Sequence, residues 1–360
     1  MIDKNSIMEI LSQTKLYEKN LAKVTDKFSN NIKSNGIVNI GSFSIYDDRA
    51  KLDYQELLYN RFGKDIYYFA DTLNKQLPKK DLRIMESNIR DIKIKRNFIN
   101  SIYMDSHGIL QFYDPTINLI STNYHNDKTK GIYHELLHMS SSSYDSVNRK
   151  IYCGFMYGNE ADGYEIGRSI NEGYTELLNQ RLFGYNIKRA SKPYRFSTVY
   201  AEKLERIIGQ EEMTHLYFKH DLNDLIMELE KYKTKEEIFK FFEQTDYLIK
   251  EEIGKKDKKI KVFGVPVMDA PVVPGKEEYT INNFLDINEF LIDAYTKKVN
   301  EKPISKKEKV ADVNNFINDL RREQIDINNN YQYTSMLKDY SAGLSEDSME
   351  GKMKLWMTTQ

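Results

Sequence analysis

The chain has 360 residues, of which 40% are hydrophobic, 30% charged and 12% aromatic, a composition typical of a globular protein and not of a disordered chain. The 53 Lys and Arg residues balance 54 Asp and Glu residues, which excludes a general basic field for nucleic acid or an anionic membrane. A single cysteine, Cys153, excludes an internal disulfide framework and a cysteine-rich zinc ribbon.

The sequence has no stretch with the features of a secretory signal or a membrane span. The N-terminus lacks the long apolar segment of a secretory signal. The most apolar later stretch, residues 262–273, contains two prolines and an aspartate and has about half the length that a membrane span needs. We therefore expect a cytoplasmic protein with no nucleic-acid or membrane partner. Export that does not use a signal peptide is the alternative.

The N-terminal half predicts helices followed by a small sheet. Residues 1–35 predict an N-terminal helical arm. Residues 54–77 have helical spacing and end before Pro78. Near-alternation predicts a strand at 89–95, and two short apolar runs within 109–120 predict a hairpin. We expect this sheet and the helix that follows it to extend to about residue 150.

The C-terminal half is predicted to be helical. Apolar stripes over residues 165–254 predict a helical lobe, in which Thr234 and Glu237 form a capping box. A lysine run and three prolines in 255–280 predict a linker. Residues 281–360 predict a helical accessory region, with a second capping box at Ser305 and Glu308 and a loose polar tail. The prediction for 36–254 is therefore one α+β domain.

The informative segment is the H-E-x-x-H motif, His134-Glu135-Leu136-Leu137-His138. Residues four apart share one face of a helix, so His134 and His138 can present two imidazole nitrogens to one zinc ion. Glu135 can then reach a water on the same metal, while the two leucines face the core. Two unrelated surface or capped histidines on an ordinary helix are the alternative.

A catalytic zinc site needs a third protein ligand and an open fourth position. Residues 139–146 contain no histidine, which argues against a third ligand directly after the motif. Further along, the stretch from Ser169 reads as a helix ending near Gly184, with Glu172 and Glu176 on one face. A capping box of Ser169 and Glu172, or a solvated acidic face, is the alternative, but it leaves the histidines without a third partner.

H-E-x-x-H followed by N-E-x-x-x-E on a second helix resembles the gluzincin zinc metallopeptidases, the thermolysin and aminopeptidase N class. The resemblance covers residues 131–180. It implies a zincin-like α+β fold with a small mixed sheet, an active-site helix and a helical C-terminal lobe. It also implies that Glu172 is the third zinc ligand, and that Asn171 and Glu176 support the ligands from behind. Such support is expected, because a ligating histidine usually donates its second N–H to a carboxylate or carbonyl.

The predicted function is that of a zinc-dependent peptidase acting on a peptide or protein. Zinc lowers the pKa of its bound water, and Glu135 takes the water's proton and passes it to the leaving amine. Tyr164, eight residues before Glu172, resembles the position of an oxyanion-stabilising tyrosine in several gluzincins. Other tyrosines compete for this role: Tyr157, Tyr174, Tyr194 and Tyr200. The hairpin at 109–120 would hold an extended peptide substrate as an added strand of the sheet. The alternative is that this hairpin has only a structural role.

The remaining histidines, His107, His125, His215 and His220, have no ligand spacing to the motif. Cys153 is interpreted as a small buried hydrophobe. The alternative function is a non-catalytic or partner-specific protein that retains a zincin fold with a structural zinc, although such a protein would not need Glu135 as a base.

Overall fold

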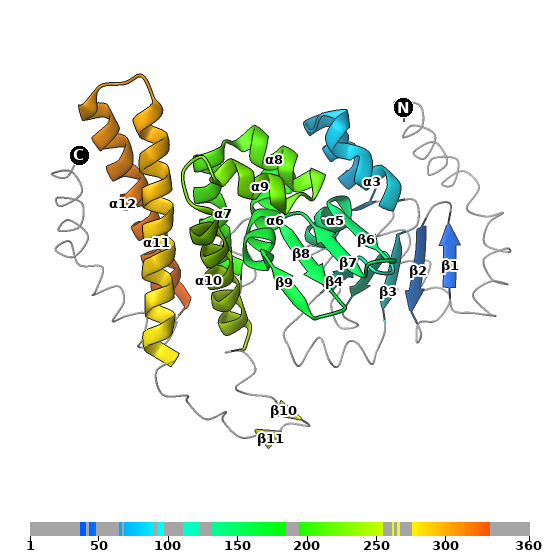
Figure 1. Cartoon of the computed structure of the whole chain (residues 1–360). Coiled ribbons are helices and arrows are strands. Elements are labelled where there is room, and N and C mark those ends of the chain that lie inside the picture. The colour runs from blue at the N-terminus through cyan, green and yellow to red at the C-terminus, as the bar shows by residue number, and fades with distance from the viewer. Residues whose placement is uncertain are drawn as a thin grey trace.

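The computed structural model describes a mixed α+β protein that is mostly helical, with its larger sheet at one end and helices α11 and α12 at the other (Figure 1). The described residues are 37–40, 43–47, 65–66, 68–89, 92–96, 111–122, 132–184, 194–254, 261–262, 265–266 and 276–331. The arm predicted for 1–35, the tail after 331 and most of the predicted linker lie outside them. The α+β class expected from the sequence is confirmed.

The larger sheet has five strands in the order β1-β2-β3-β5-β4. The strands are β1 (Ile37–Ile40), β2 (Phe43–Asp47), β3 (Lys93–Arg96), β4 (Gln111–Asp114) and β5 (Leu119–Thr122). β2, β3 and β5 run parallel, while β1 and β4 pair antiparallel at the two edges. The predicted hairpin is therefore confirmed, and its turn is fixed by Asp114 Oδ1, which accepts the Thr116 N–H at 2.9 Å.

Before β3 the prediction was wrong in its boundary. Residues 68–76 are helical and end before Pro78, as expected, and a 3-10 turn η1 (Lys79–Leu82) leads into α3 (Arg83–Asn88). The Ile89 N–H donates to the Met85 carbonyl at 2.9 Å, so Ile89 closes this helix. The strand begins only at Lys93, because local helical hydrogen bonds outcompete the alternating pattern at its start.

A second, four-stranded antiparallel sheet was not predicted. It consists of β6 (Ser142–Asp145), β7 (Lys150–Cys153), β8 (Met156–Asn159) and β9 (Tyr164–Ile166), paired in chain order. These strands are short and rich in Ser, Tyr and Gly, so they carry no clear apolar alternation. The sheet joins the helix of the H-E-x-x-H motif to the helix that carries Glu172.

The helices follow the predicted order. They are α5 (Ile132–Ser140), α6 (Arg168–Phe183), α7 (Arg195–Ile208), α8 (Gln210–Lys219), α9 (Leu222–Leu229), α10 (Lys235–Gly254), α11 (Lys276–Glu301) and α12 (Lys306–Tyr331). Both capping boxes are present, with reciprocal hydrogen bonds between Thr234 and Glu237 and between Ser305 and Glu308. Within the predicted linker lies a small hairpin of β10 (Lys261–Val262) and β11 (Val265–Pro266), and α11 begins before its predicted end.

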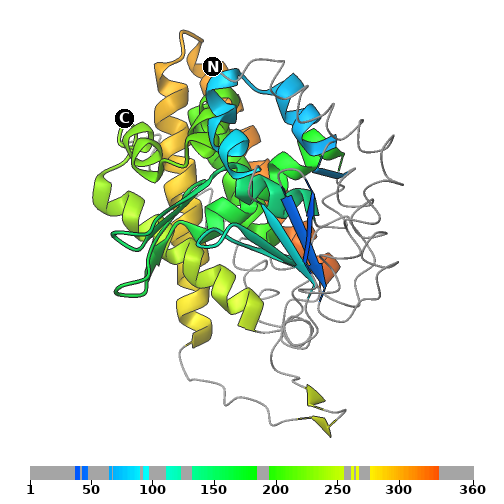
Figure 2. The ribbon, with the colours of Figure 1, turned by 90° about the vertical axis from the view of Figure 1, so that its right-hand side faces the viewer.

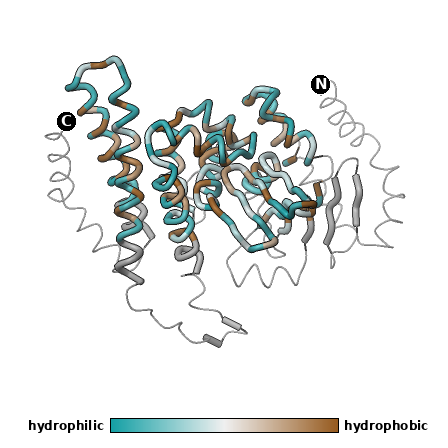
Figure 3. The backbone as a smooth tube through the Cα atoms, viewed as in Figure 1, coloured by the Kyte–Doolittle hydropathy of each residue, from teal (hydrophilic) through white to brown (hydrophobic). Residues whose placement is uncertain are grey.

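One hydrophobic core extends from Ile66 to Leu320 and includes residues of the long C-terminal helices. α11 packs against α7 and α10, and α12 packs against α7. The view in Figure 2 shows α11 running along the helices of the lobe. Along α11 and α12 hydrophobic and hydrophilic residues alternate from turn to turn (Figure 3), the pattern of helices that bury one face. In the described residues no helix is long and apolar enough to cross a membrane.

The backbones of α6 and α7 meet at Gly173. A Cβ added to Gly173 would lie 2.0 Å from the Ser197 carbonyl oxygen and 2.7 Å from the Thr198 nitrogen. Only glycine therefore allows the first turn of α7 to lie this close to α6. The contact matters for the site described below, because Glu172 precedes Gly173 and Tyr194 precedes the first residue of α7.

Replacing Gly173 by Ala should destabilise the protein. Alanine gains about 1 kcal/mol of helix propensity over glycine, but overpacking against a backbone costs about 1–3 kcal/mol or more. We expect a lower free energy of unfolding in urea, measured by circular dichroism. Gly158→Ala is the control, because a Cβ there would make ordinary contacts of 3.7 Å with Ile151 Cβ and 3.8 Å with the Tyr164 carbonyl oxygen. Equal stability of the two variants would contradict the close approach.

Candidate metal centre

Helix α5 presents the two motif histidines on one face and its leucines on the other. His134 and His138 are each 7% exposed, while Leu136 and Leu137 are fully buried in the core. The helix ends in a run of serines whose hydroxyls satisfy its last carbonyls. Ser140, Ser141 and Ser142 donate to the carbonyls of Leu136, Leu137 and His138 at 2.8, 3.0 and 2.6 Å. The serine run therefore ends the helix directly after the second histidine without leaving buried carbonyls unpaired.

Helix α6 brings Glu172 to the histidines, and its N-terminus is fixed by Asp246 of α10. The Gly167 and Ser169 N–H groups donate to the two oxygens of the Asp246 carboxylate, each at 2.7 Å. The carboxylate satisfies free N–H groups and complements the helix dipole. The helix is therefore capped by Asp246 and begins after Gly167, and the alternative of a Ser169–Glu172 capping box does not hold. Nor does a solvated acidic face, since Glu176 is buried.

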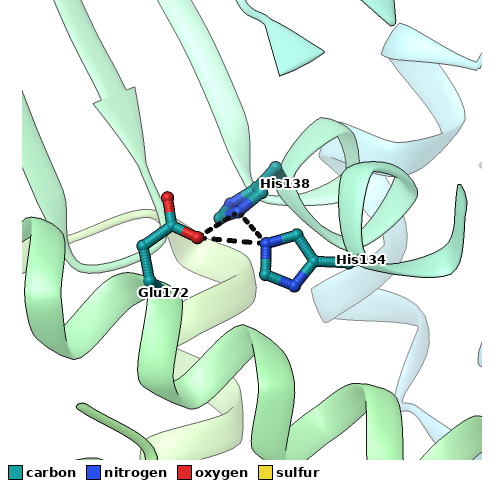
Figure 4. A group of neighbouring side chains, drawn as sticks. All are labelled: His134, His138 and Glu172. Carbon is teal, nitrogen blue, oxygen red and sulfur yellow. Dashed lines mark hydrogen bonds and ion pairs between the residues drawn. The ribbon is translucent and has the colours of Figure 1, made fainter. Parts of the chain in front are cut away.

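The three predicted ligand atoms converge (Figure 4). His134 Nε2 lies 3.0 Å from both His138 Nε2 and Glu172 Oε2, and His138 Nε2 lies 3.3 Å from the same oxygen. Ligand atoms about 2.0–2.1 Å from a tetrahedral zinc ion stand about 3.3 Å from one another. His134, His138 and Glu172 can therefore bind a metal, and in the described part of the chain they form the one group of three or more His, Cys, Asp or Glu residues with this geometry.

Hydrogen bonding with both rings protonated at Nε2 leaves a conflict among these three atoms. If both rings directed an N–H at Glu172, the two N–H groups would also face each other across 3.0 Å. A single cation among the three atoms removes this conflict, because each atom then offers it a lone pair. The donor set of two imidazoles and one carboxylate suits a divalent transition metal.

The charges of the cluster are strongly coupled. Burial opposes the charged form of His134, but the Glu176 and Glu172 carboxylates outweigh it and raise the pKa of His134 to about 10. Burial likewise opposes ionisation of Glu172, yet the two imidazoles hold its pKa well below the ordinary value. The Glu172 carboxylate thus stays ionised and attracts positive charge to the point where the ligand atoms meet.

The two residues expected behind the ligands lie there. Glu176 Oε1 is 3.1 Å from His134 Nδ1, on the side of the ring away from the cluster. Asn171 Nδ2 is 3.4 Å from His138 Nδ1. Within the described residues, His134 Nδ1 and Glu176 Oε2 are both buried and neither has a partner at good hydrogen-bond geometry. The roles of Asn171 and Glu176 toward a bound metal stay predictions.

Glu135 lies buried beside the cluster and next to the edge strand of the larger sheet. Burial raises the pKa of Glu135, whereas the imidazoles of His134 and His138 and a hydrogen bond from the Tyr113 backbone lower it, leaving the pKa above its ordinary value. Tyr113 belongs to β4. The Glu135 carboxylate thus interacts both with the ligand residues and with the backbone of β4.

The structure does not bring Tyr164 to the cluster. Its side chain on β9 is 45% exposed, its ring faces Tyr157 at 6.3 Å, and its acidic neighbours are Glu243 and Asp246. Three of the competing tyrosines have other surroundings. Tyr157 also contacts Tyr152, and the Tyr174 hydroxyl donates to Glu205. Tyr200 is buried in the hydrophobic core.

Tyr194, which precedes α7, is the tyrosine at the cluster. Its ring stacks on His134 with a centroid separation of 5.6 Å and an angle of 11°. Burial, then the charges of Glu172 and Glu135, raise the pKa of Tyr194 well above its ordinary value. The phenol therefore keeps its proton and is a hydrogen-bond donor beside the ligands. The helical pattern begins at Ser197 in the sequence, and nothing in the spacing from the motif indicates that the chain returns to His134 here.

Two further residues of the site were not identified from the sequence. Asp246 lies 77 or more positions from the N–H groups that it caps, so no local pattern points to it. Cys153 was interpreted as a buried hydrophobe, and it is buried, but its Sγ lies 3.4 Å from His138 Nδ1. The histidines set aside stay apart from the cluster where they are described: His215 contacts Asp81 and His220 ends α8. His107 and His125 lie outside the described residues.

Comparisons of the chain with protein-family models, with curated proteins and with solved structures found no match.

The ligand assignment predicts a selective loss of metal. We expect about one zinc per chain in the wild-type protein by elemental analysis and a loss of most of it in Glu172→Ala. Glu211→Ala is the matched control, because Glu211 is an exposed glutamate in the first turn of α8. Equal zinc content in the two variants would remove Glu172 from the ligand set.

Proposed function

We propose that this protein is a zinc-dependent peptidase of the gluzincin type with a zincin-like fold. The observation that carries the proposal is the position of Glu135, a buried carboxylate with a raised pKa beside three converging ligand atoms. A site that served only to stabilise the fold would not need such a group. The order of a mixed sheet, the H-E-x-x-H helix and a second helix with the third ligand also agrees with this class.

His134, His138 and Glu172 would hold the zinc ion, which supplies Lewis acidity and lowers the pKa of a water molecule when it is bound. Structural zinc sites are closed by four protein ligands, whereas catalytic sites have three and an open position. Cys153 is not a fourth ligand, because it faces His138 Nδ1 and the cluster is formed by Nε2. In the part of the chain that the structure describes, the donor count is three, which favours a catalytic centre over a structural one.

Glu135 would act as the proton carrier. Its raised pKa lets the carboxylate take a proton from the attacking water and later deliver it to the leaving amine. Tyr194 would donate its hydroxyl proton in a hydrogen bond to the oxyanion that develops on the scissile carbonyl. Its raised pKa keeps this donor protonated at neutral pH. In the proposal Tyr194 takes the role that the sequence assigned to Tyr164.

An extended peptide is the substrate that the edge strand favours. Among the described strands, β4 is the last of its sheet and pairs with β5 alone. Its backbone already contacts Glu135 through Tyr113, so a peptide added along β4 would carry its scissile bond toward Glu135. Pairing of main chain with main chain on a strand edge is a general mode of peptide binding.

Glu135→Gln should retain zinc and lose hydrolysis. Glutamine preserves the shape of the side chain but cannot accept and return the proton, so we expect a fall in kcat of about 10²–10⁴-fold. The assay follows cleavage of quenched fluorescent peptides and of casein, with zinc content measured on the same sample. Turnover equal to wild type would remove Glu135 as the base.

Tyr194→Phe should reduce kcat by about 10²–10³-fold, the usual cost of losing one oxyanion donor, with zinc content unchanged. Tyr164→Phe is the matched control and should leave kcat at the wild-type value, because its side chain lies away from the ligands. If Tyr164→Phe lost activity and Tyr194→Phe did not, the assignment of the two tyrosines would be reversed.

A further inference from the structure

The second ring nitrogen of His138 is enclosed by two side chains. Cys153 Sγ and Asn171 Nδ2 each lie 3.4 Å from His138 Nδ1. The imidazole, the thiol and the amide are all buried. The hydrogen bond of this nitrogen must therefore be made within the protein, and its direction decides which nitrogen of His138 carries the proton.

The Asn171 amide has a fixed orientation. Its Oδ1 accepts the Phe155 N–H at 3.2 Å, which leaves Nδ2 facing the His138 ring. The turn between β7 and β8 is built around this amide, since a Cβ on Gly154 would lie 2.2 Å from Asn171 Oδ1. Glycine at 154 also has φ of +53°, a conformation that favours this residue. Asn171 thus presents a donor to the ring, not an acceptor.

The tautomer of His138 follows from this arrangement. To offer its Nε2 lone pair to a metal, a neutral imidazole must carry its proton on Nδ1. That N–H needs an acceptor, and Asn171 Nδ2 cannot be one. The Cys153 sulfur can accept it, and it also lies 3.6 Å from Asn171 Nδ2, which donates to it. The thiol proton can point to the His138 carbonyl, 4.0 Å from Sγ.

We propose that Cys153 is a positioning residue for the metal centre: its sulfur accepts the His138 Nδ1–H and holds the ring in the tautomer that binds metal. In this proposal Cys153 would do for His138 what the Glu176 carboxylate, 3.1 Å from Nδ1, is predicted to do for His134. This inference rests on the metal-binding part of the proposed function. It assigns to a thiol the role that a carboxylate, a backbone carbonyl or a water usually has.

The test is zinc affinity, measured by competition with a chelator at fixed pH. Loss of the group that orients a metal ligand typically weakens binding by about 10–100-fold, which is the effect expected for Cys153→Ala. Cys153→Ser retains an acceptor and should recover most of the affinity. Ile166→Val is the control for lost packing, because Ile166 of β9 is as deeply buried as Cys153, and it should bind zinc as the wild type does.

The tautomer is measured directly in the zinc-loaded wild-type protein by long-range proton–nitrogen NMR, and Cys153→Ser, which retains an acceptor, is the second variant if Cys153→Ala fails to fold. The expected result is a proton on His138 Nδ1. Wild-type affinity in Cys153→Ala, or a proton on Nε2, would overturn the inference. Zinc binding without peptide cleavage would refute the proposed function and leave this inference standing, whereas a wild-type protein that binds no zinc would overturn both.

Discussion

The constraint on which the structure depends is the burial of two carboxylates against two imidazoles. Glu172 and Glu176 face His134 and His138 within 3.0–3.3 Å in the interior. Removing charged groups from water costs several kcal/mol for each group unless they are paired with good geometry. The cluster therefore exists only if α5 and α6 are held at a fixed distance, and the surrounding fold has to supply that distance. A cation bound at the cluster would couple its binding free energy to the stability of the same helices.

Several contacts with no ligand role fix the two helices. The Asp246 carboxylate anchors the start of α6 to α10, and serine hydroxyls bind the last carbonyls of α5, which ends at Ser140. Asn88 of α3 adds a further connection by donating to the carbonyls of Met139 and Ser142 at 2.8 and 2.7 Å. The geometry of the metal centre is thus determined by side chains from three regions of the chain, and a change in any of them should move the ligands.

The sequence predicted the ligands but not their surroundings, and the reason is physical. Spacing within one helix determines which residues share a face, so local periodicity placed His134 with His138 and Glu172 with Glu176. The role of Glu172 as the third ligand was predicted from the resemblance to the gluzincins. Helices and their caps were also predictable, as at Thr234 and Glu237, because the residues that form a capping box lie only three positions apart in the sequence. Asp246, Tyr194 and Cys153 reach the site through tertiary packing, which no local pattern records. The second sheet was missed because strands of three or four residues carry too little periodicity.

The helices beyond the predicted linker also bear on the site. α7 begins at the residue after Tyr194, and its position is fixed on one side by the backbone contact at Gly173. On the other side, the fully buried Lys203 of α7 pairs with Glu323 of α12 at 3.0 Å. Lys203 also lies 3.4 Å from Glu202 of its own helix, so Glu323 is one of two partners of this buried charge. The contact between Lys203 and Glu323 adds to the packing of α12 against α7. The tyrosine beside the ligands is therefore held, through α7, by a helix more than a hundred residues further along the chain. It follows that the region after the linker is part of the structure that orders the metal centre, not a separate attachment to it.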